Sequence, residues 1–170
     1  MRFFWPNPIT AQTLTAAGWT PSRRVDITDW IDRLEAEGFH VSPRAAAILE
    51  SFGNLAIHPP ERPAALWPAE PIFFDPIDVA NGMYDRYADF ESTLGHHMTP
   101  LAANASGTTF LRILDDGRIV SDGILALHHL APTFPQALDL LIRRHRTPDL
   151  LLSYNRPTPV VQSSNSLQVC

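Results

Sequence analysis

Four short apolar runs in the second half of the chain constrain its fold more than any other feature. The runs cover residues 98–103, 108–114, 118–121 and 124–129. The segments between them are rich in Asn, Asp and Gly, which are the residues of tight hairpin turns. Consecutive strands joined by such short turns run antiparallel, so the sequence predicts an antiparallel meander. The three turn sequences are Asn104-Ala105-Ser106-Gly107, Asp115-Asp116-Gly117 and Asp122-Gly123.

Helix signals dominate the first third of the chain and return near its end. An N-cap residue followed by proline, as in Ser42-Pro43, starts several of the expected helices, and a glycine ends most of them. A proline-rich connection from Pro59 to Pro76 is expected to contain a short strand at 72–74, and another short strand is expected at 55–57. Thr133 begins a capping-box pattern that opens the last helix. The other expected helices cover residues 8–17, 28–37, 43–52 and 76–94, the last with a pause at Gly82.

This order of elements predicts an α+β fold, with N-terminal helices and a C-terminal helix packed on a mainly antiparallel sheet. The chain has 170 residues, which suits one domain, and we assign residues 1–152 to it. Residues 153–170 are polar, interrupted by proline and without periodicity. We expect them to form a flexible C-terminal tail.

Charge and composition exclude several classes of protein. All 13 basic residues are arginine and face 18 acidic residues, which gives a net charge of −5. This acidity argues against a nucleic-acid partner, and the lack of lysine excludes a lysine nucleophile or a P-loop lysine. No apolar run approaches the ~18 residues of a membrane span, so no membrane partner is expected. The single cysteine, Cys170, forms no internal disulfide, and a cytoplasmic location is the expectation.

Two histidine pairs are the main features that suggest catalysis. They are His96-His97 and His128-His129, which lie where adjacent side chains of a strand point to opposite faces. One histidine from each pair, with an Asp or Glu, would make the metal site of a small hydrolase. The alternative is that one histidine of each pair packs and the other is solvated. Because the sequence lacks HExxH, GxSxG and GxGxxG, we expect no catalytic residues, no metal and no cofactor.

The segment from Asp75 to Glu91 is the strongest candidate for binding a partner. It carries five carboxylates against one arginine, Arg86, and aromatic residues lie among them. Charges of one sign steer a partner of the opposite sign, while aromatic rings anchor it. The alternative is a solvated helix face with one apolar stripe. The candidate partner-binding residues are Trp67, Asp75, Asp78, Tyr84, Asp85, Tyr87, Asp89 and Glu91.

The stretch from Ala17 to Asp26, AGWTPSRRVD, resembles the opening signature of the third subgroup of the SUKH superfamily. That signature reads Ala-Gly-Trp, a spacer, Pro-Gly-Arg and Val-Asp, and the similarity extends over residues 14–145. Ser22 stands where the family usually has glycine, and Asn54 replaces the second glycine of Phe-Gly-Gly-Leu. Asparagine is the next-best residue for a left-handed conformation, so that turn can survive. Other matching motifs are Phe52-Gly53-Asn54-Leu55, Leu94-Gly95, Pro100-Leu101, Asp116-Gly117-Arg118-Ile119 and Gln136-Ala137-Leu138.

The resemblance implies an immunity protein of a bacterial polymorphic toxin system, built as a single α+β domain. Such a protein is not an enzyme; it binds and neutralises a cognate toxin domain, often a nuclease or a deaminase. The acidic segment favours stoichiometric occlusion of a basic toxin surface. A regulatory or scaffold module of the same superfamily is the alternative, and a small metal-dependent hydrolase is the rival from another class. The sequence leaves the oligomeric state open.

Overall fold

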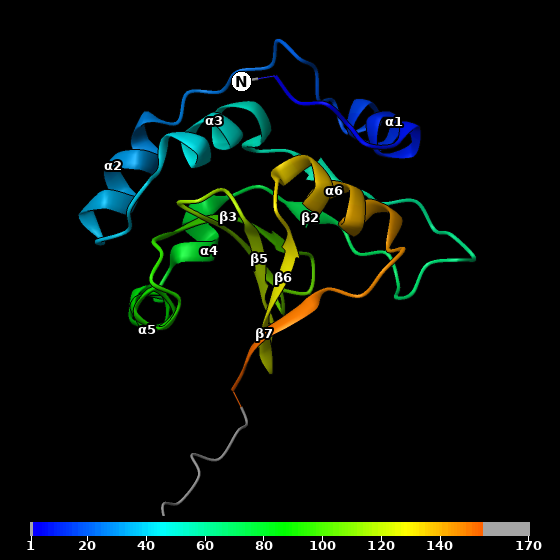
Figure 1. Cartoon of the computed structure of the whole chain (residues 1–170). Helices are drawn as coiled ribbons and strands as arrows, with labels where there is room; N and C mark the ends of the chain where they lie inside the picture. Colours follow the sequence, from blue (N-terminus) through cyan, green and yellow to red (C-terminus); the bar gives the residue numbers. More distant parts are fainter. Residues whose placement is uncertain (1, 155–170) are drawn as a thin grey trace, which may run out of the picture.

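A seven-stranded sheet runs through the molecule with its strands in chain order, each antiparallel to its neighbours. The computed structural model describes residues 2–154 (Figure 1). It confirms the α+β class and the meander in the second half of the chain. The helices are α1 (Pro8–Ala16), α2 (Thr28–Ala36), α3 (Pro43–Phe52), α4 (Pro76–Ala80), α5 (Tyr84–Leu94) and α6 (Phe134–Arg143). The strands are β1 (Ala56–Ile57), β2 (Ile72–Phe73), β3 (Met98–Asn104), β4 (Phe110–Leu114), β5 (Ile119–Asp122), β6 (Ala126–Ala131) and β7 (Asp149–Ser153).

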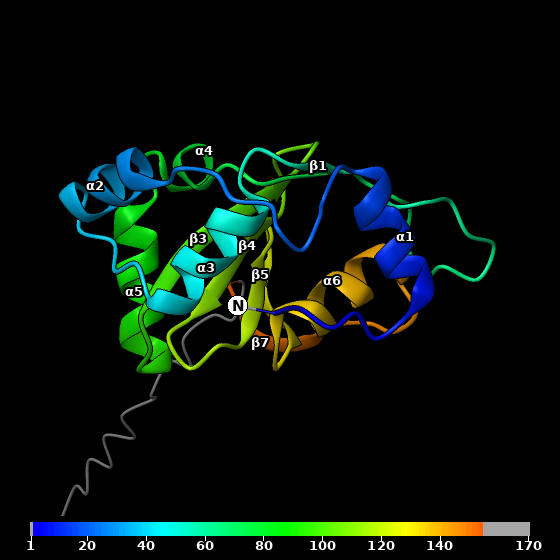
Figure 2. The ribbon, with the colours of Figure 1, turned by 90° about the horizontal axis from the view of Figure 1, so that it is seen from above.

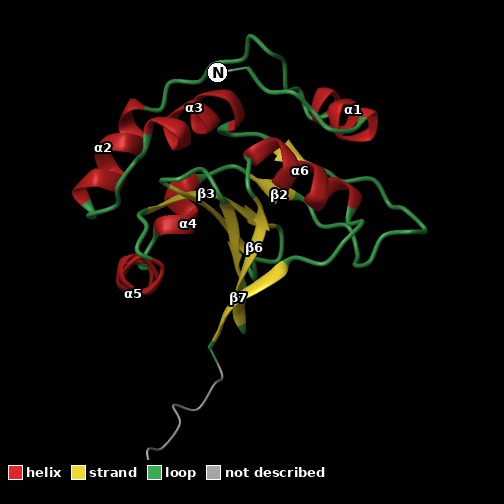
Figure 3. Ribbon diagram, viewed as in Figure 1, coloured by secondary structure: helices red, strands yellow, loops and turns green. Residues whose placement is uncertain are grey.

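Helices cover both faces of the sheet. Figure 2 shows α2, α4 and α5 gathered at one side of the molecule and α1 and α6 at the other. In Figure 3 the strands, in yellow, lie between α5 and α6. Alternate residues of β4 serve the two faces, because Leu111 and Ile113 belong to the core under α3 and α6, whereas Leu114 belongs to the core under α5.

The core under α3 and α6 is rich in aromatic rings. Trp19 is buried, and its ring stacks on Phe52 with the centroids 5.7 Å apart. Trp30 is half-buried against the same core. Its ring makes glycine necessary at position 53, since a Cβ there would lie 2.5 Å from a carbon of Trp30. The next residue, Asn54, has a φ of 61°, which confirms the left-handed conformation expected for it.

Helix starts follow the sequence signals with one exception. The Asn7 side chain accepts a hydrogen bond from the N–H of Ile9 at 2.9 Å, and Ser42 caps α3 in the same way. The prediction of a capping box at Thr133 is wrong. Its hydroxyl donates to the side-chain oxygen of Gln136 at 2.9 Å and accepts no backbone N–H.

Strand β7 is absent from the sequence prediction. Its leucines show no alternation with polar residues, and the strand forms because β6 offers a free edge for pairing. Ser153, assigned above to the C-terminal tail, lies in β7, and the N–H of Tyr154 donates to the carbonyl of Leu125 at 3.0 Å. The rest of the proposed tail, residues 155–170, lies outside the described residues.

Two hairpin turns differ from the sequence expectation. The β4–β5 turn is not the type I′ turn that its Asp-Asp-Gly sequence suggests, because only Gly117 has a positive φ, of 100°. The N–H of Gly117 donates to the carbonyl of Leu114, which makes a three-residue loop that ends in a glycine bulge. In the next hairpin, Asp122 is not a solvated turn residue. It is the last residue of β5, pairs with Phe110 and is 1% exposed.

Candidate functional site

Exposed carboxylates gather on the side of the molecule formed by α2, α4 and α5. Helix α2 packs against α4, and the ring of Tyr84 at the start of α5 meets that of Phe39, just after α2, with the centroids 5.5 Å apart. The three helices therefore lie next to one another on one side of the molecule (Figure 2). We call these exposed carboxylates the acidic face: Asp29, Asp32, Glu35, Glu37, Asp75, Asp78, Asp85 and Asp89.

The acidic face concentrates more negative charge than the whole chain carries. Residues 26–37 and 75–91 hold ten of the 18 acidic residues but only two of the 13 arginines. These two segments have a net charge of −8, and the remaining residues have +3, which together give the −5 of the chain. A field of this kind attracts positively charged surfaces and repels polyanions.

The two arginines of these segments do little to neutralise the acidic face. Arg33 lies 3.7 Å from Asp29, and both side chains are more than half exposed, so solvent screens this pair. Arg86 is turned inward from α5 toward the end of β5. Its Nε and Nη2 donate to the two carboxylate oxygens of Asp122 at 2.9 and 2.7 Å.

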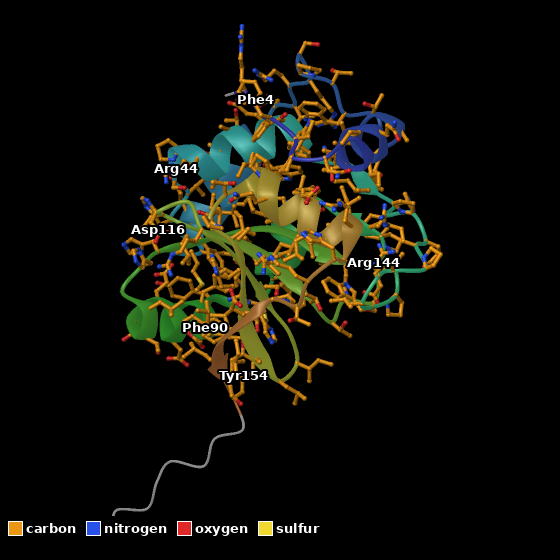
Figure 4. All side chains as sticks on the ribbon, turned by 45° about the vertical axis from the view of Figure 1, so that its right-hand side comes forward. Phe4, Arg44, Phe90, Asp116, Arg144 and Tyr154 are labelled. Atoms are coloured by element: carbon orange, nitrogen blue, oxygen red, sulfur yellow. The ribbon has the colours of Figure 1, made fainter. Side chains whose placement is uncertain are left out.

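Asp122 is the centre of a buried cluster that holds α5 against the sheet. Besides Arg86, the carboxylate accepts hydrogen bonds from Nη2 of the fully buried Arg112 and from the hydroxyl of Tyr154, the latter at 2.6 Å. The rings of Phe90 and Tyr154 stack with their centroids 5.6 Å apart (Figure 4). The hydrogen bond to Asp122 raises the pKa of Arg86, whereas burial lowers the pKa of Arg112.

Tyr87 belongs to this cluster and not to the surface. It is 1% exposed, and the guanidinium carbon of Arg112 lies 3.5 Å from the centre of its ring. Burial raises the pKa of Tyr87 well above its usual range. Its assignment as a partner-binding anchor is therefore corrected, because a ring inside the core cannot reach a partner.

Five of the other candidate residues are exposed. Asp78, Asp85 and Asp89 are exposed on the acidic face, with Tyr84, 44% exposed, beside them. Asp75 also caps α4, where its Oδ1 accepts from two backbone N–H groups at 3.0 and 3.2 Å.

Glu91 and Trp67 are not free parts of this surface. Glu91 is half-buried, and its Oε1 accepts the N–H of Met98 at 2.7 Å, which ties the end of α5 to β3. Trp67 packs half-buried against the aromatic core, beside Arg144 in a hollow of about 280 Å³. Arg144 follows α6, on the opposite side of the sheet from α5 (Figure 4).

The carboxylates of α2 are the part of the surface that sequence reasoning missed. Residues 26–37 carry five acidic residues against Arg33 alone, a signal as strong as that of the 75–91 segment. What the sequence does not give is the contact between α2 and α4, which joins segments about forty residues apart into one face.

The histidines are distributed over separate contacts. Nδ1 of His96 lies 2.7 Å from Asp115, and this hydrogen bond lowers the pKa of the Asp115 carboxyl. Nδ1 of His97 lies 3.1 Å from Glu91, and that of His129 lies 3.9 Å from Asp149. Within residues 2–154, no three His, Cys, Asp or Glu side chains are grouped as a metal site.

Three comparisons and one structural finding bear on what kind of protein this is. No helix within the described part of the chain has both the length and the apolarity to cross a membrane. Neither the curated proteins nor the solved structures yield a match. The model of the SUKH-3 immunity protein family matches residues 6–144, from just before α1 to the residue after α6. The match takes in every helix of the fold and all of the acidic face, so the chain belongs to the SUKH-3 immunity protein family.

Proposed function

We propose that this protein binds and neutralises a cognate bacterial toxin domain, a nuclease or a deaminase, by stoichiometric occlusion in the cytoplasm. The observation that carries the proposal is the charge of −8 on the segments that form α2, α4 and α5, in a chain of net −5. Proteins that act on nucleic acids bind phosphates through arginine and lysine. The acidic face has the opposite charge and fits such a surface.

The two kinds of residue on this face have different roles in the proposed complex. The carboxylates accelerate encounter by long-range attraction, which raises the association rate constant. Tyr84 is the exposed ring in their midst and serves as an anchor, because its burial on binding slows dissociation. The Asp122 cluster fixes α5, so these groups meet the toxin already in place.

Binding alone accounts for protection in this proposal. A toxin whose basic surface is covered cannot bind its substrate, so no catalytic group, metal or cofactor of the immunity protein is needed. One immunity protein inactivates one toxin domain. Protection should therefore fail when toxin is in molar excess.

Removal of charge from the acidic face tests the proposal directly. The variant Asp32→Asn, Asp85→Asn, Asp89→Asn removes three exposed carboxylates and no buried contact. The matched control Glu50→Gln, Glu61→Gln, Asp149→Asn removes three exposed carboxylates outside the face. Each variant is co-expressed with the product of the gene immediately upstream, and growth rescue is scored together with pull-down of that product.

We expect the control to protect cells as the wild type does and the acidic-face variant to need a higher expression level. Equal protection by both variants would place the toxin on another surface. Failure of the wild type to bind or protect would refute the immunity function for this toxin.

A further inference from the structure

A hollow of about 450 Å³ lies at the end of the acidic face, between α4 and the strands β1–β4. Its floor is a row of residues that lie opposite one another in consecutive strands. Ala56 pairs with Phe73, Phe73 with Ala103, and Ala103 with Phe110. Cross-strand partners project from the same face of a sheet, so these four side chains line up side by side.

The alternation of small and large residues in this row creates the hollow. Ala103 lies between two phenylalanines, and the Cα positions of Phe73 and Phe110 are two strand spacings apart, or about 10 Å. The rings of Phe73 and Phe110 thus stand on either side of a slot, and the methyl group of Ala103 lies at its base. Phe73 is 42% exposed, so its ring is accessible to a ligand in the slot.

The rim of the hollow is acidic. Asp75, which caps α4, and Asp78, in its first turn, line the rim, and both are exposed. The other residues that line it are apolar or neutral, and no arginine is among them. The slot therefore offers apolar walls for a carbon chain and carboxylates for a cation at its mouth.

We propose that this hollow receives an arginine side chain of the toxin. The aliphatic stem lies over Ala103, the planar guanidinium stacks against Phe73 or Phe110, and Asp75 and Asp78 accept its hydrogen bonds. The inference rests on the proposed function, and it identifies arginine as a residue type by which the toxin would contact the acidic face.

A second cavity, of about 560 Å³, lies beside the N-terminal segment and α6, and it fits this partner poorly. It has an apolar floor as well, but two arginines, Arg2 and Arg44, line it against one carboxylate, Asp116. These two cations would repel a basic side chain. Of these two cavities, the hollow beside α4 is therefore the better complement to a basic toxin surface.

A small probe tests the hollow without the toxin. The probe is Nα-acetyl-arginine methylamide, and its matched control is the citrulline analogue, which has nearly the same shape but no charge. Amide chemical shifts of the 15N-labelled protein are followed as each compound is added. We expect millimolar binding of the arginine probe, with the largest shifts around Phe73 and Ala105, and about threefold to tenfold weaker binding of citrulline.

Two variants assign the binding to these side chains. Asp78→Asn and Phe73→Ala should each weaken the arginine probe about threefold to tenfold, whereas Asp149→Asn should leave it unchanged. Both positions are exposed, and unchanged amide spectra elsewhere will show that the variants are folded. Shifts that are absent, or that persist in both variants, would overturn the inference even where the protein still protects cells from the toxin. Failure of protection with intact probe binding would instead count against the proposed function alone.

Discussion

Asp122 brings three parts of the chain together through one carboxylate. Arg86 reaches it from α5, Arg112 from β4 and Tyr154 from the end of β7. Two guanidinium groups share this single negative charge; Arg112 and Asp122 are fully buried, whereas Arg86 is 39% exposed. Such a group is costly to remove, because its loss leaves the buried Arg112 without a counter-charge.

The first prediction concerns this carboxylate. We expect Asp122→Asn to lower the free energy of unfolding by about 3–5 kcal/mol. Tyr154→Phe removes one hydrogen bond but leaves the charges paired, so it should cost only about 1 kcal/mol. Urea unfolding monitored by circular dichroism measures both. A cost for Asp122→Asn no larger than that of Tyr154→Phe would show that the cluster does not depend on charge.

The burial of the residues in this cluster could not be predicted from the sequence. Asp122-Gly123 has the composition of a solvated turn, and Tyr87 stands among exposed acidic residues. Asp122 and Tyr87 are nevertheless buried. They lie beside Arg112, which stands in the middle of an otherwise apolar strand and needs a carboxylate and an aromatic face next to it. No local pattern reports such a pairing between positions far apart in the sequence.

Helix α5 has one face built for the sheet and one for solvent. Tyr87 and Phe90 point into the core, while Asp85 and Asp89, four residues apart, point outward. Periodicity is enough to predict this helix and its end at Gly95, which has a φ of 70°. What periodicity cannot predict is β7, whose pairing with β6 brings Tyr154 under α5.

At the element scale, the tyrosines that hold α5 and the end of β7 predict a loss of stability in alkali. Burial is the main cause that raises the pKa of both Tyr87 and Tyr154 above the ordinary value of 10.0. Above pH 10 the unfolded chain therefore loses its tyrosine protons before the folded protein does. The free energy of unfolding should therefore fall as the pH rises above 10. Well below pH 10 both tyrosines are protonated in the folded and the unfolded protein, so they do not make the free energy of unfolding depend on pH.

The lack of lysine makes this effect easy to measure, because tyrosines are then the main side chains that titrate between about pH 9.5 and 11. Urea midpoints recorded across that range should decline for the wild type. The decline should be shallower for Tyr154→Phe, which loses one of the two groups. A midpoint that stays constant up to pH 11 would contradict the assignment.

At the scale of the whole molecule, negative charge is concentrated in the segments that form α2, α4 and α5. The helices and the strands other than β7 could be predicted from turn signals and apolar spacing, since these signals lie close together in the sequence. The acidic face could be predicted only in part. Its α4 and α5 half lies in one acidic segment, but its α2 half joins it through a tertiary contact.

The same limit applies to the hollow beside α4. Its floor joins Ala56, Phe73, Ala103 and Phe110 from four strands, and the register that aligns them is not encoded in any one segment. Shifting any of these strands by one residue would turn its side chain to the other face of the sheet.

The central claim, that the acidic face steers a basic toxin domain, is tested most directly by the salt dependence of association. The association rate constant is measured by stopped flow at ionic strengths from about 20 to 500 mM, for the wild type and for Asp32→Asn, Asp85→Asn, Asp89→Asn. We expect the wild-type rate constant to fall about tenfold or more over this range, and the variant to associate more slowly at low salt with a much flatter dependence. Rate constants that coincide at every ionic strength would contradict the account.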